Sequence, residues 1–286
     1  MNLEKRIEML DEAESFKKEF ERKLQPTQML TRDKPVVFIS IGGGELGDLV
    51  VTAARRWLGG VNGGVKTVVF DRYEGCPAQD SADSFECFDM LNGEVLEKMI
   101  KRYVPNATIP HVIFLEIERI DTVRVCKLGI EEGYNVVSTP FGPLICMDRY
   151  LTKLMFERLN LPCVEWAYAT SQEEIEKIAK DLNFPIIVKP VMTSSGHGTS
   201  IVWNEHQLKG VYEFSVKHAR GKGDEVIVEK YLKELKEIGT EITQIAVRHF
   251  DENGRIVTSV LPPIEHKRPG ATYHESWLPA TISETA

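Results

Sequence analysis

The chain has 286 residues, of which 42% are hydrophobic and 27% are charged, and its formal net charge is −8. This is the composition of a globular protein, and the length exceeds what one small core organises, so two or three subdomains are expected. The acidic balance, without a long basic block, argues against binding to nucleic acid or to an anionic membrane. A small anionic ligand remains compatible with it, because local lysines and helix N-termini outweigh the net charge.

The sequence also indicates where the protein is located and the redox state of its cysteines. The N-terminus is highly charged and no run of about 18 apolar residues occurs, so neither a signal peptide nor a membrane span is expected. The 5 cysteines include no C-x-x-C pair, which favours reduced thiols in a cytoplasmic protein.

The first element expected is a long amphipathic helix. Residues 3–24 place apolar side chains at helical spacing with charges between them, and Pro26 marks the end of the helix. We expect its apolar stripe to pack on the same chain rather than on a second subunit.

From Pro35 onward, the pattern alternates strand and helix. Strands are expected at 36–41, 67–71, 111–116 and 135–138, and helices at 49–58, 94–102 and 121–132. Strands separated by helices of about ten residues indicate βαβ units and a parallel sheet. Ligands of such sheets lie beyond the carboxyl ends of the strands.

A second unit is expected from about residue 148. Its helices are predicted at 151–159, 172–182 and 205–219, and its strands at 164–169, 186–191, 199–203, 225–229, 240–250 and 255–261. Ser171 is predicted to cap the second of these helices, with Glu174 completing a capping box. Asp251-Glu252-Asn253-Gly254 predicts a hairpin turn between the last two strands, and no element is expected after them.

The most informative segment is 186–201, IIVKPVMTSSGHGTSI. A β-branched strand leads through Lys189 into a loop of small residues, 193–199. Such a loop lets backbone N–H groups and hydroxyls close around a phosphate chain, and the lysine supplies positive charge. The alternative is a glycine-containing hairpin loop beside an ordinary surface lysine.

A glycine turn, GGGELG at 42–47, follows the first strand. With Asp71 at the end of the next strand, it satisfies the dinucleotide fingerprint and suggests an NAD-linked oxidoreductase. It also fits a tight strand–helix turn, or an anion site for another phosphorylated ligand. Glu45 favours this last interpretation, because an acid is awkward against a pyrophosphate but suits an amine.

Two further segments carry weaker signals. Glu116 and Glu118 follow the third strand predicted. We expect Glu116, rather than Glu118, to lie with Glu45 on the rim that the carboxyl ends of the strands form. In the segment 225–232, a strand edge offers backbone groups to an adenine, with Glu229 or Glu241 accepting from ribose hydroxyls. No H-E-x-x-H or G-x-S-x-G sequence occurs, so a histidine or serine nucleophile has no support.

Together these motifs resemble one family, the formate-dependent glycinamide ribonucleotide transformylases of purine biosynthesis, which are ATP-grasp enzymes. The matching runs are collinear from about residue 35: GGGELG (42–47), FDRY and CPA (70–78), DMLNGEVL (89–96), EIE (116–118), EEGYNVV (131–137), MDR (147–149), PIIVKPVMTSSGHG (185–198), VIVE (226–229), EIT (241–243) and YHESWLP (273–279).

The resemblance implies a fold that combines α/β and α+β parts. Its expected divisions are a helical extension at 1–30, a Rossmann-like pre-ATP-grasp domain at 31–147, an ATP-grasp lid subdomain at 148–224, and the start of the larger ATP-grasp subdomain at 225–286.

The resemblance also implies a reaction, in which ATP converts formate to formyl phosphate and the amine of glycinamide ribonucleotide attacks it. Such chemistry depends on positioning and charge neutralisation, so no catalytic side chain is assigned. By motif match, Glu45, Leu46 and Glu116 hold the ribonucleotide. The residues implied for ATP are Arg149, Lys189, Ser194, Ser195, Gly196, His197, Gly198, Thr199, Glu229, Lys230, Tyr231, Leu232 and Glu241.

Family members bind Mg²⁺ through carboxylates on strands that would follow residue 286, so no metal ligand is assigned in this chain. His197 stands where the family commonly has lysine. We expect an enzyme that uses ATP, formate and glycinamide ribonucleotide, with this chain inactive if those strands are required. The alternatives are a non-catalytic ATP-binding module and an NAD(P)-linked oxidoreductase, and a homodimer is left open.

Overall fold

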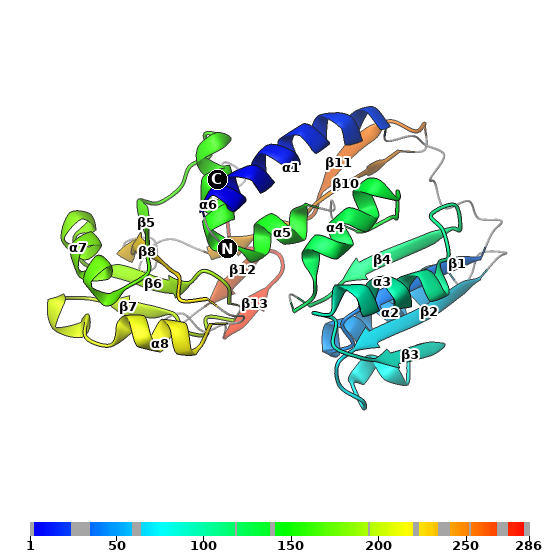
Figure 1. The fold of residues 1–286 in the computed structure, drawn as a ribbon, viewed down its shortest axis with the longest axis horizontal. Helices are drawn as coiled ribbons and strands as arrows, with labels where there is room; N and C mark the ends of the chain where they lie inside the picture. The colour runs from blue at the N-terminus through cyan, green and yellow to red at the C-terminus, as the bar shows by residue number, and fades with distance from the viewer. Residues whose placement is uncertain are drawn as a thin grey trace. The chain divides into compact units, whose positions relative to one another are not determined.

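The protein is described by a computed structural model. The structure describes residues 3–23, 35–58, 64–117, 119–137, 141–193, 195–219, 223–233, 241–251, 253–267 and 274–282. The chain divides into two compact units, Met1–Met147 and Asp148–Ala286, and each is described by itself (Figure 1).

The first unit is built on a four-stranded sheet whose parallel arrangement was predicted, although one of its strands, Ser84–Cys87, was not. Its strands are β1 (Val36–Ile41), β2 (Val65–Asp71), β3 (Ser84–Cys87) and β4 (His111–Leu115), in the order β3-β2-β1-β4. Ile41 pairs with Phe70 on one side and with Leu115 on the other, so β2, β1 and β4 end at the same edge of the sheet. The fourth strand predicted, 135–138, is reduced to one parallel bridge between Ile113 and Val136.

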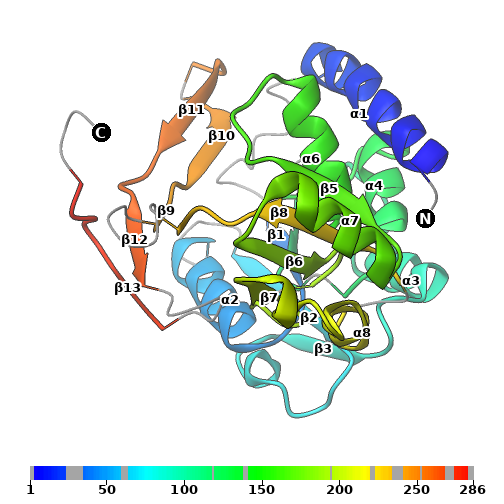
Figure 2. The same cartoon turned by 90° about the vertical axis from the view of Figure 1, so that its left-hand side faces the viewer.

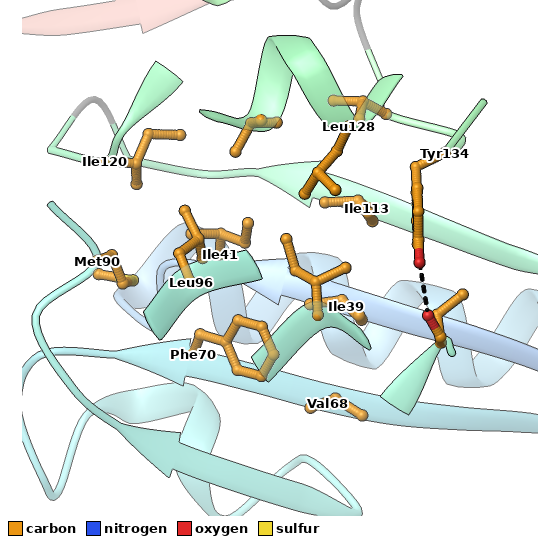
Figure 3. Close-up of a cluster of buried hydrophobic side chains, with 14 residues drawn as sticks. Ile39, Ile41, Val68, Phe70, Met90, Leu96, Ile113, Ile120, Leu128 and Tyr134 are labelled. Atoms are coloured by element: carbon orange, nitrogen blue, oxygen red, sulfur yellow. Dashed lines mark hydrogen bonds between the residues drawn. The ribbon is translucent and has the colours of Figure 1, made fainter. Parts of the chain in front are cut away.

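Helices cover both faces of this sheet. On one face lies α2 (Glu45–Leu58), and on the other lie α3 (Gly93–Tyr103) and α4 (Thr122–Glu131). The core on the α3–α4 face is drawn in Figure 3, where the hydroxyl of Tyr134 donates to the backbone carbonyl of Val104 at 3.0 Å. Its labelled members are Ile39, Ile41, Val68, Phe70, Met90, Leu96, Ile113, Ile120, Leu128 and Tyr134. Burying each large apolar side chain contributes about 1.5–3 kcal/mol.

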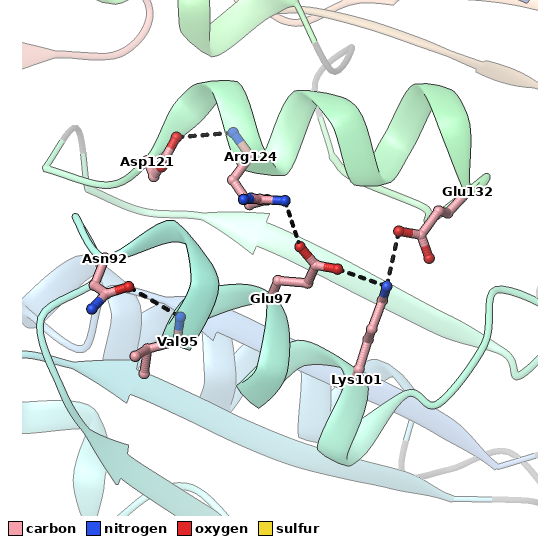
Figure 4. Close-up of polar contacts among 7 residues, drawn as sticks. All are labelled: Asn92, Val95, Glu97, Lys101, Asp121, Arg124 and Glu132. Atoms are coloured by element: carbon pink, nitrogen blue, oxygen red, sulfur yellow. Dashed lines mark hydrogen bonds and ion pairs between the residues drawn. The ribbon is translucent and has the colours of Figure 1, made fainter.

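Polar side chains cap the N-termini of α3 and α4. Asn92 accepts from the backbone N–H of Val95 at 3.2 Å, and Asp121 accepts from that of Arg124 at 2.9 Å (Figure 4). Such caps satisfy N–H groups that have no partner inside the helix.

An ion-pair network then links α3 to α4. Glu97 contacts Lys101 at 2.7 Å and Arg124 at 2.9 Å, and Lys101 also reaches Glu132 at 2.9 Å (Figure 4). The hydrogen bond from Lys101 is the main reason why the pKa of Glu97 lies below its ordinary value. Because these groups are accessible to solvent, the network contributes little to the free energy of unfolding. It links the exposed surfaces of α3 and α4.

The N-terminal helix, α1 (Leu3–Lys23), packs on its own chain, as expected. Leu10 and Ala13 are buried, and Ala13 forms a small cluster with Cys126 on α4 and Phe141. Phe141 directly precedes α5 (Gly142–Met147), a short helix that the sequence pattern did not predict.

The second unit begins with α6 (Arg149–Arg158) and contains a four-stranded antiparallel sheet. The strands are β5 (Trp166–Ala169), β6 (Ile186–Pro190), β7 (Ser200–Val202) and β8 (Val226–Lys230), in the order β5-β8-β6-β7. The helices α7 (Gln172–Leu182) and α8 (Val211–Lys217) share one core with it (Figure 2). That core contains alternate residues of β6 and β8, so the residues between them point to the opposite face.

The predicted cap of α7 is confirmed, whereas the helix expected at 205–219 is wrong as a single element. Ser171 accepts from the backbone N–H of Glu174 at 3.2 Å. The stretch 205–219 instead forms a 3₁₀ turn, η3 (Glu205–Gln207), followed by α8 after Gly210. Glycine has low helix propensity, which explains the break.

The last strands lie outside this sheet. The predicted hairpin is confirmed by β10 (Ala246–Phe250) and β11 (Ile256–Val260), although Glu252 of its turn lies outside the described residues. The strand expected at 240–250 is divided, because β9 (Glu241–Thr243) pairs with β12 (Ile264–Lys267). The strand β12 also pairs with β13 (Glu275–Trp277), and neither of these two was predicted. Among the described helices, none is both long and apolar enough to cross a membrane.

The packing of His111 predicts a pH-dependent stability of the first unit. Its Nδ1–H donates to Ile109 O at 2.6 Å and its Nε2 accepts from Asn135 N at 2.8 Å, so the ring is neutral. Burial lowers the pKa of His111 from its ordinary 6.5. As the pH falls below 6.5, the unfolded chain takes up a proton that the folded chain does not, and stability is lost down to the folded-state pKa.

We therefore expect the melting temperature to fall between about pH 7.5 and pH 5.5, with each unit of pKa shift corresponding to about 1.4 kcal/mol. The variant His111→Gln should lose this component of the slope. Parallel melting curves of variant and parent with equal pH dependence would contradict the assignment.

Candidate functional site

The glycine turn of the first unit is held by backbone and carboxylate contacts. Gly42 has φ +111°, and its carbonyl accepts from the hydroxyl of Ser40 at 2.9 Å. The following helix begins at Glu45, four residues earlier than predicted, so Gly47 lies within α2 rather than in the turn. A Cβ at Gly47 would lie 2.5 Å from the carbonyl oxygen of Gly42, so glycine is required there for close packing.

Asp71 at the end of β2 supports this turn. One of its carboxylate oxygens accepts from Gly43 N at 2.8 Å and the other from Tyr73 N at 3.0 Å. The side chain is buried, with 7% of its surface exposed. Both oxygens are thus bound to the backbone of their own unit, which disfavours Asp71 as the partner of a ribose hydroxyl and the oxidoreductase interpretation with it.

Glu116 lies against the same turn, directly after β4. A Cβ at Gly42 would overlap its Oε2 atom, and one at Gly44 would lie 3.6 Å from Oε1. Oε2 is buried and has no hydrogen-bond partner among the described residues. Burial, followed by the negative charge of Asp71, raises the pKa of Glu116 above its ordinary value. An unpartnered buried carboxylate is costly, so a donor from a ligand would stabilise it.

This position is the topological switch point of the sheet, because β2 and β4 lie on opposite sides of β1. Glu45 and Leu46, predicted to act with Glu116, are exposed in the first turn of α2, and 63% of Leu46 is accessible. Glu118 lies outside the described residues. The structure therefore brings the three predicted ribonucleotide residues to one rim.

In the second unit, the side chains of Lys153, Lys189 and Glu229 meet on the sheet face opposite α7 and α8. Lys189 on β6 contacts Glu229 Oε2 at 2.6 Å, and Lys153 on α6 contacts Glu229 Oε1 at 3.0 Å. Burial would raise the pKa of Glu229, but the ion pairs with Lys189 and Lys153 outweigh it and hold this pKa below the ordinary value. Sequence reasoning predicted Lys189 and Glu229 and missed Lys153.

Arg149 adds a further cation to this face. Its backbone N–H donates to Val191 O at 3.0 Å and its guanidinium to Pro190 O at 3.2 Å, which fixes the start of α6 beside the end of β6. Burial lowers the pKa of the Arg149 guanidinium, and the charge of Glu229 partly opposes this effect. Three cations around a single carboxylate leave an excess of positive charge that suits a phosphate chain.

The predicted phosphate loop is a compact turn. Thr193 donates from its hydroxyl to His197 O at 2.9 Å, and Thr199 N donates to Gly196 O at 3.1 Å. Ser195 and His197 are exposed, whereas Gly198 is buried and accepts on its carbonyl from Ser215 at 2.7 Å.

Gly198 has φ +67°, and a Cβ there would lie 2.7 Å from Pro190. Glycine is therefore required where the loop returns to the sheet. Ser194 lies outside the described residues.

The segment 225–232, which contains β8 and the two residues after it, was predicted to offer backbone groups to an adenine. Lys230 N donates to Glu165 O at 2.9 Å and Tyr231 N to Pro185 O at 3.1 Å, so both N–H groups are already used. The ammonium group of Lys230 donates to Leu182 O at 2.7 Å and caps the end of α7. The backbone N–H and the ammonium group of Lys230 are therefore both bound within the protein.

Glu241, also predicted for ATP, begins β9 and pairs with His266 on β12. It belongs to the three-stranded sheet β13-β12-β9 and not to the sheet that carries Lys189 and Glu229.

The sequence was compared with known proteins. The model of the ATP-grasp domain family matches residues 154–286. A formate-dependent phosphoribosylglycinamide formyltransferase of Sulfurisphaera tokodaii is 39% identical over 247 residues, which cover 85% of this chain and 58% of that protein. The chain thus spans little more than half the length of the curated relatives it matches.

Solved structures share the fold. An N5-carboxyaminoimidazole synthetase from Staphylococcus aureus, complexed with ADP, has a TM-score of 0.68 and 24% identity over 87% of this chain and 59% of that one. A structure titled glycinamide-RNase-transformylase T, from Mycobacterium tuberculosis, has a TM-score of 0.64 and 22% identity over 87% of this chain and 62% of that one.

The contact between Gly42 and Glu116 predicts an unusually costly substitution. Gly42→Ala should lower the free energy of unfolding by at least about 2 kcal/mol, through a strained φ and overlap with the Glu116 carboxylate. Gly75 is the matched control, because it has φ +76° and nothing within 4 Å of an added Cβ. Gly75→Ala should cost about 1 kcal/mol in urea denaturation. Equal losses of unfolding free energy in the two variants would show that the Glu116 side chain does not restrict the space at Gly42.

Proposed function

The chain belongs to the ATP-grasp family and is a relative of the formate-dependent phosphoribosylglycinamide formyltransferases, and from this premise we propose that it acts in ATP-dependent formylation of glycinamide ribonucleotide. The observation that supports this best is the cationic cluster on the face of the second sheet, formed by Arg149, Lys153 and Lys189 around Glu229. A cluster of this kind neutralises a triphosphate, and the carboxylate rim of the first unit suits an amine.

For the nucleotide, Lys189 and Arg149 provide positive charge and the loop 193–199 provides backbone N–H groups. Leu232 N is the remaining N–H of the segment 230–232, because those of Lys230 and Tyr231 are bound within the protein. We assign it as the donor to the adenine ring. The edge of the adenine would then pair with an N–H group that has no partner among the described residues.

For the ribonucleotide, Glu116 is the residue that the structure supports most strongly. Its buried, unpartnered Oε2 would accept a hydrogen bond from the substrate amine. A carboxyl group whose pKa is raised accepts a proton readily, which also suits an amine that loses one when it attacks. Glu45 and Leu46 would contribute from the first turn of α2.

The reaction proposed has two transfers. A formate oxygen attacks the γ-phosphorus of ATP, giving formyl phosphate and ADP, and the ribonucleotide amine then attacks the formyl carbon, releasing phosphate and a proton. The residues of this chain act by binding, orienting the reactants and balancing charge.

Mg²⁺ bound with the nucleotide would neutralise negative charge on the phosphates in such a reaction. Among the described residues, no three side chains of histidine, cysteine, aspartate or glutamate gather as a metal site. Because Mg²⁺ is usually held by one or two carboxylates together with nucleotide phosphates, this finding assigns no ligand to the ion within the described part of the chain.

The proposal predicts turnover when the chain is incubated with formate, Mg²⁺-ATP and glycinamide ribonucleotide. ADP and formylated ribonucleotide should form in equal amounts, and omission of formate should abolish both. Tight ATP binding without product would favour the non-catalytic binding module. Calorimetric heat with NAD or NADP, and none with ATP, would refute the proposal altogether.

Lys189→Ala should weaken ATP binding tenfold or more, roughly 1.4 kcal/mol, because one phosphate-binding cation is lost. Lys180→Ala on the exposed side of α7 is the matched control and should bind ATP like the parent. Isothermal titration calorimetry measures both dissociation constants. Unchanged affinity in Lys189→Ala would remove this lysine from the site.

A further inference from the structure

Glu229 is compensated by two lysines that come from different elements. Each carboxylate oxygen contacts its own ammonium group, with Lys153 at 3.0 Å and Lys189 at 2.6 Å. The two lysines differ in exposure, since 12% of the Lys153 side chain is accessible but 26% of Lys189. The side chain of Glu229 itself is 8% exposed.

The ligand proposed for this face competes for one of these pairs. Lys189 is the more exposed lysine, and it lies on the strand that leads into the loop 193–199. A lysine is a compact charge on a flexible stem, and a triphosphate offers it more negative charge than one carboxylate. When Lys189 turns to the phosphates, Glu229 loses a partner, and a buried carboxylate without compensation is strongly destabilised.

Lys153 is placed to prevent this loss. It lies one helical turn after Arg149 on α6, so both cations are on the same side of the helix. Its ammonium group also donates to Sγ of the exposed Cys163 at 3.1 Å.

The helix that carries Lys153 is itself fixed to the sheet. The ring of Tyr150 stacks on Tyr168 of β5 with centroids 4.7 Å apart, and meets Trp166 edge-on at 5.6 Å. These ring contacts anchor the helix that carries Lys153 to β5.

We propose that Lys153 is a positioning residue of the nucleotide site, which keeps Glu229 ionised and in place while Lys189 turns from Glu229 to the phosphates of ATP. This inference rests on the proposed function. Among the described residues, the charged and titratable groups around Glu229 are Lys189 on β6, Arg149 and Lys153 on α6, and Cys163 against Lys153. Arg149 is drawn to the phosphates together with Lys189, which leaves Lys153 as the counter-charge of Glu229.

The proposal has a consequence for the number of protons that the protein takes up when ATP binds. In the parent protein, Glu229 stays ionised and ATP binding takes up no proton there. In Lys153→Met, the departure of Lys189 leaves a buried, uncompensated carboxylate, which binds a proton from solvent. ATP affinity of this variant should then rise by up to tenfold for each pH unit lowered, whereas that of the parent should not acquire this dependence.

The test measures proton uptake by calorimetry. ATP is titrated into each variant at about pH 8 in two buffers of different ionisation enthalpy, and the dissociation constant is followed down to about pH 6. Lys153→Met should take up close to one more proton than the parent and bind ATP roughly tenfold more weakly at the higher pH. Lys153→Arg should behave like the parent, because it keeps the charge. The double variant Lys153→Met with Glu229→Gln should lose the uptake, because an amide does not titrate.

Lys180→Met controls for loss of a lysine elsewhere, and Lys153→Gln replaces Lys153→Met if the latter does not fold. Equal proton counts in the parent and in Lys153→Met would overturn the role of Lys153, as would uptake of one proton by the parent itself. Absence of ATP binding in the parent would instead overturn the proposed function, and the inference with it.

Discussion

The organisation of the second unit depends on one constraint, the compensation of the buried carboxylate of Glu229. A carboxylate that is 8% exposed must be paired. Alternation along β6 and β8 places Lys189 and Glu229 on the face away from α7 and α8, so one partner comes from the sheet itself. The second partner, Lys153, requires α6 to cover that face, and the stacking of Tyr150 on Tyr168 secures it. The cationic surplus is therefore a consequence of how the carboxylate is buried.

The first unit shows the opposite balance at the edge of its sheet. Asp71 and Glu116 lie on either side of the turn at Gly42–Gly44, and only Asp71 is fully satisfied by backbone N–H groups. Burial, followed by the negative charge of Asp71, raises the pKa of Glu116, and its unpartnered Oε2 atom is available to a donor. Each unit thus carries the charge that its proposed ligand lacks: cations for the phosphates of ATP, and a carboxylate for an amine.

Much of this fold could be predicted from the sequence, and the misses have common causes. β-branched runs such as 36–41 and 186–190 predicted their strands because both are deeply buried. The strands β3, β12 and β13 have at most 4 residues each and are largely accessible, so they carry no clear apolar pattern. The division of 240–250 depends on pairing with β12, a long-range contact that no local pattern contains.

The candidate site was predictable in its members more than in their roles. Lys189 and Glu229 were identified separately, but their ion pair depends on the antiparallel register that sets Ile187 opposite Glu229. Lys230 was assigned to ATP, and only the structure shows its ammonium group bound to the end of α7. Lys153 stands four residues after Arg149, a spacing that puts both on one helix face, and this signal is visible in the sequence. This spacing becomes informative only once the buried carboxylate of Glu229 is known to face the same side of α6. The role of Lys153 can therefore be recognised only from the charge that it compensates.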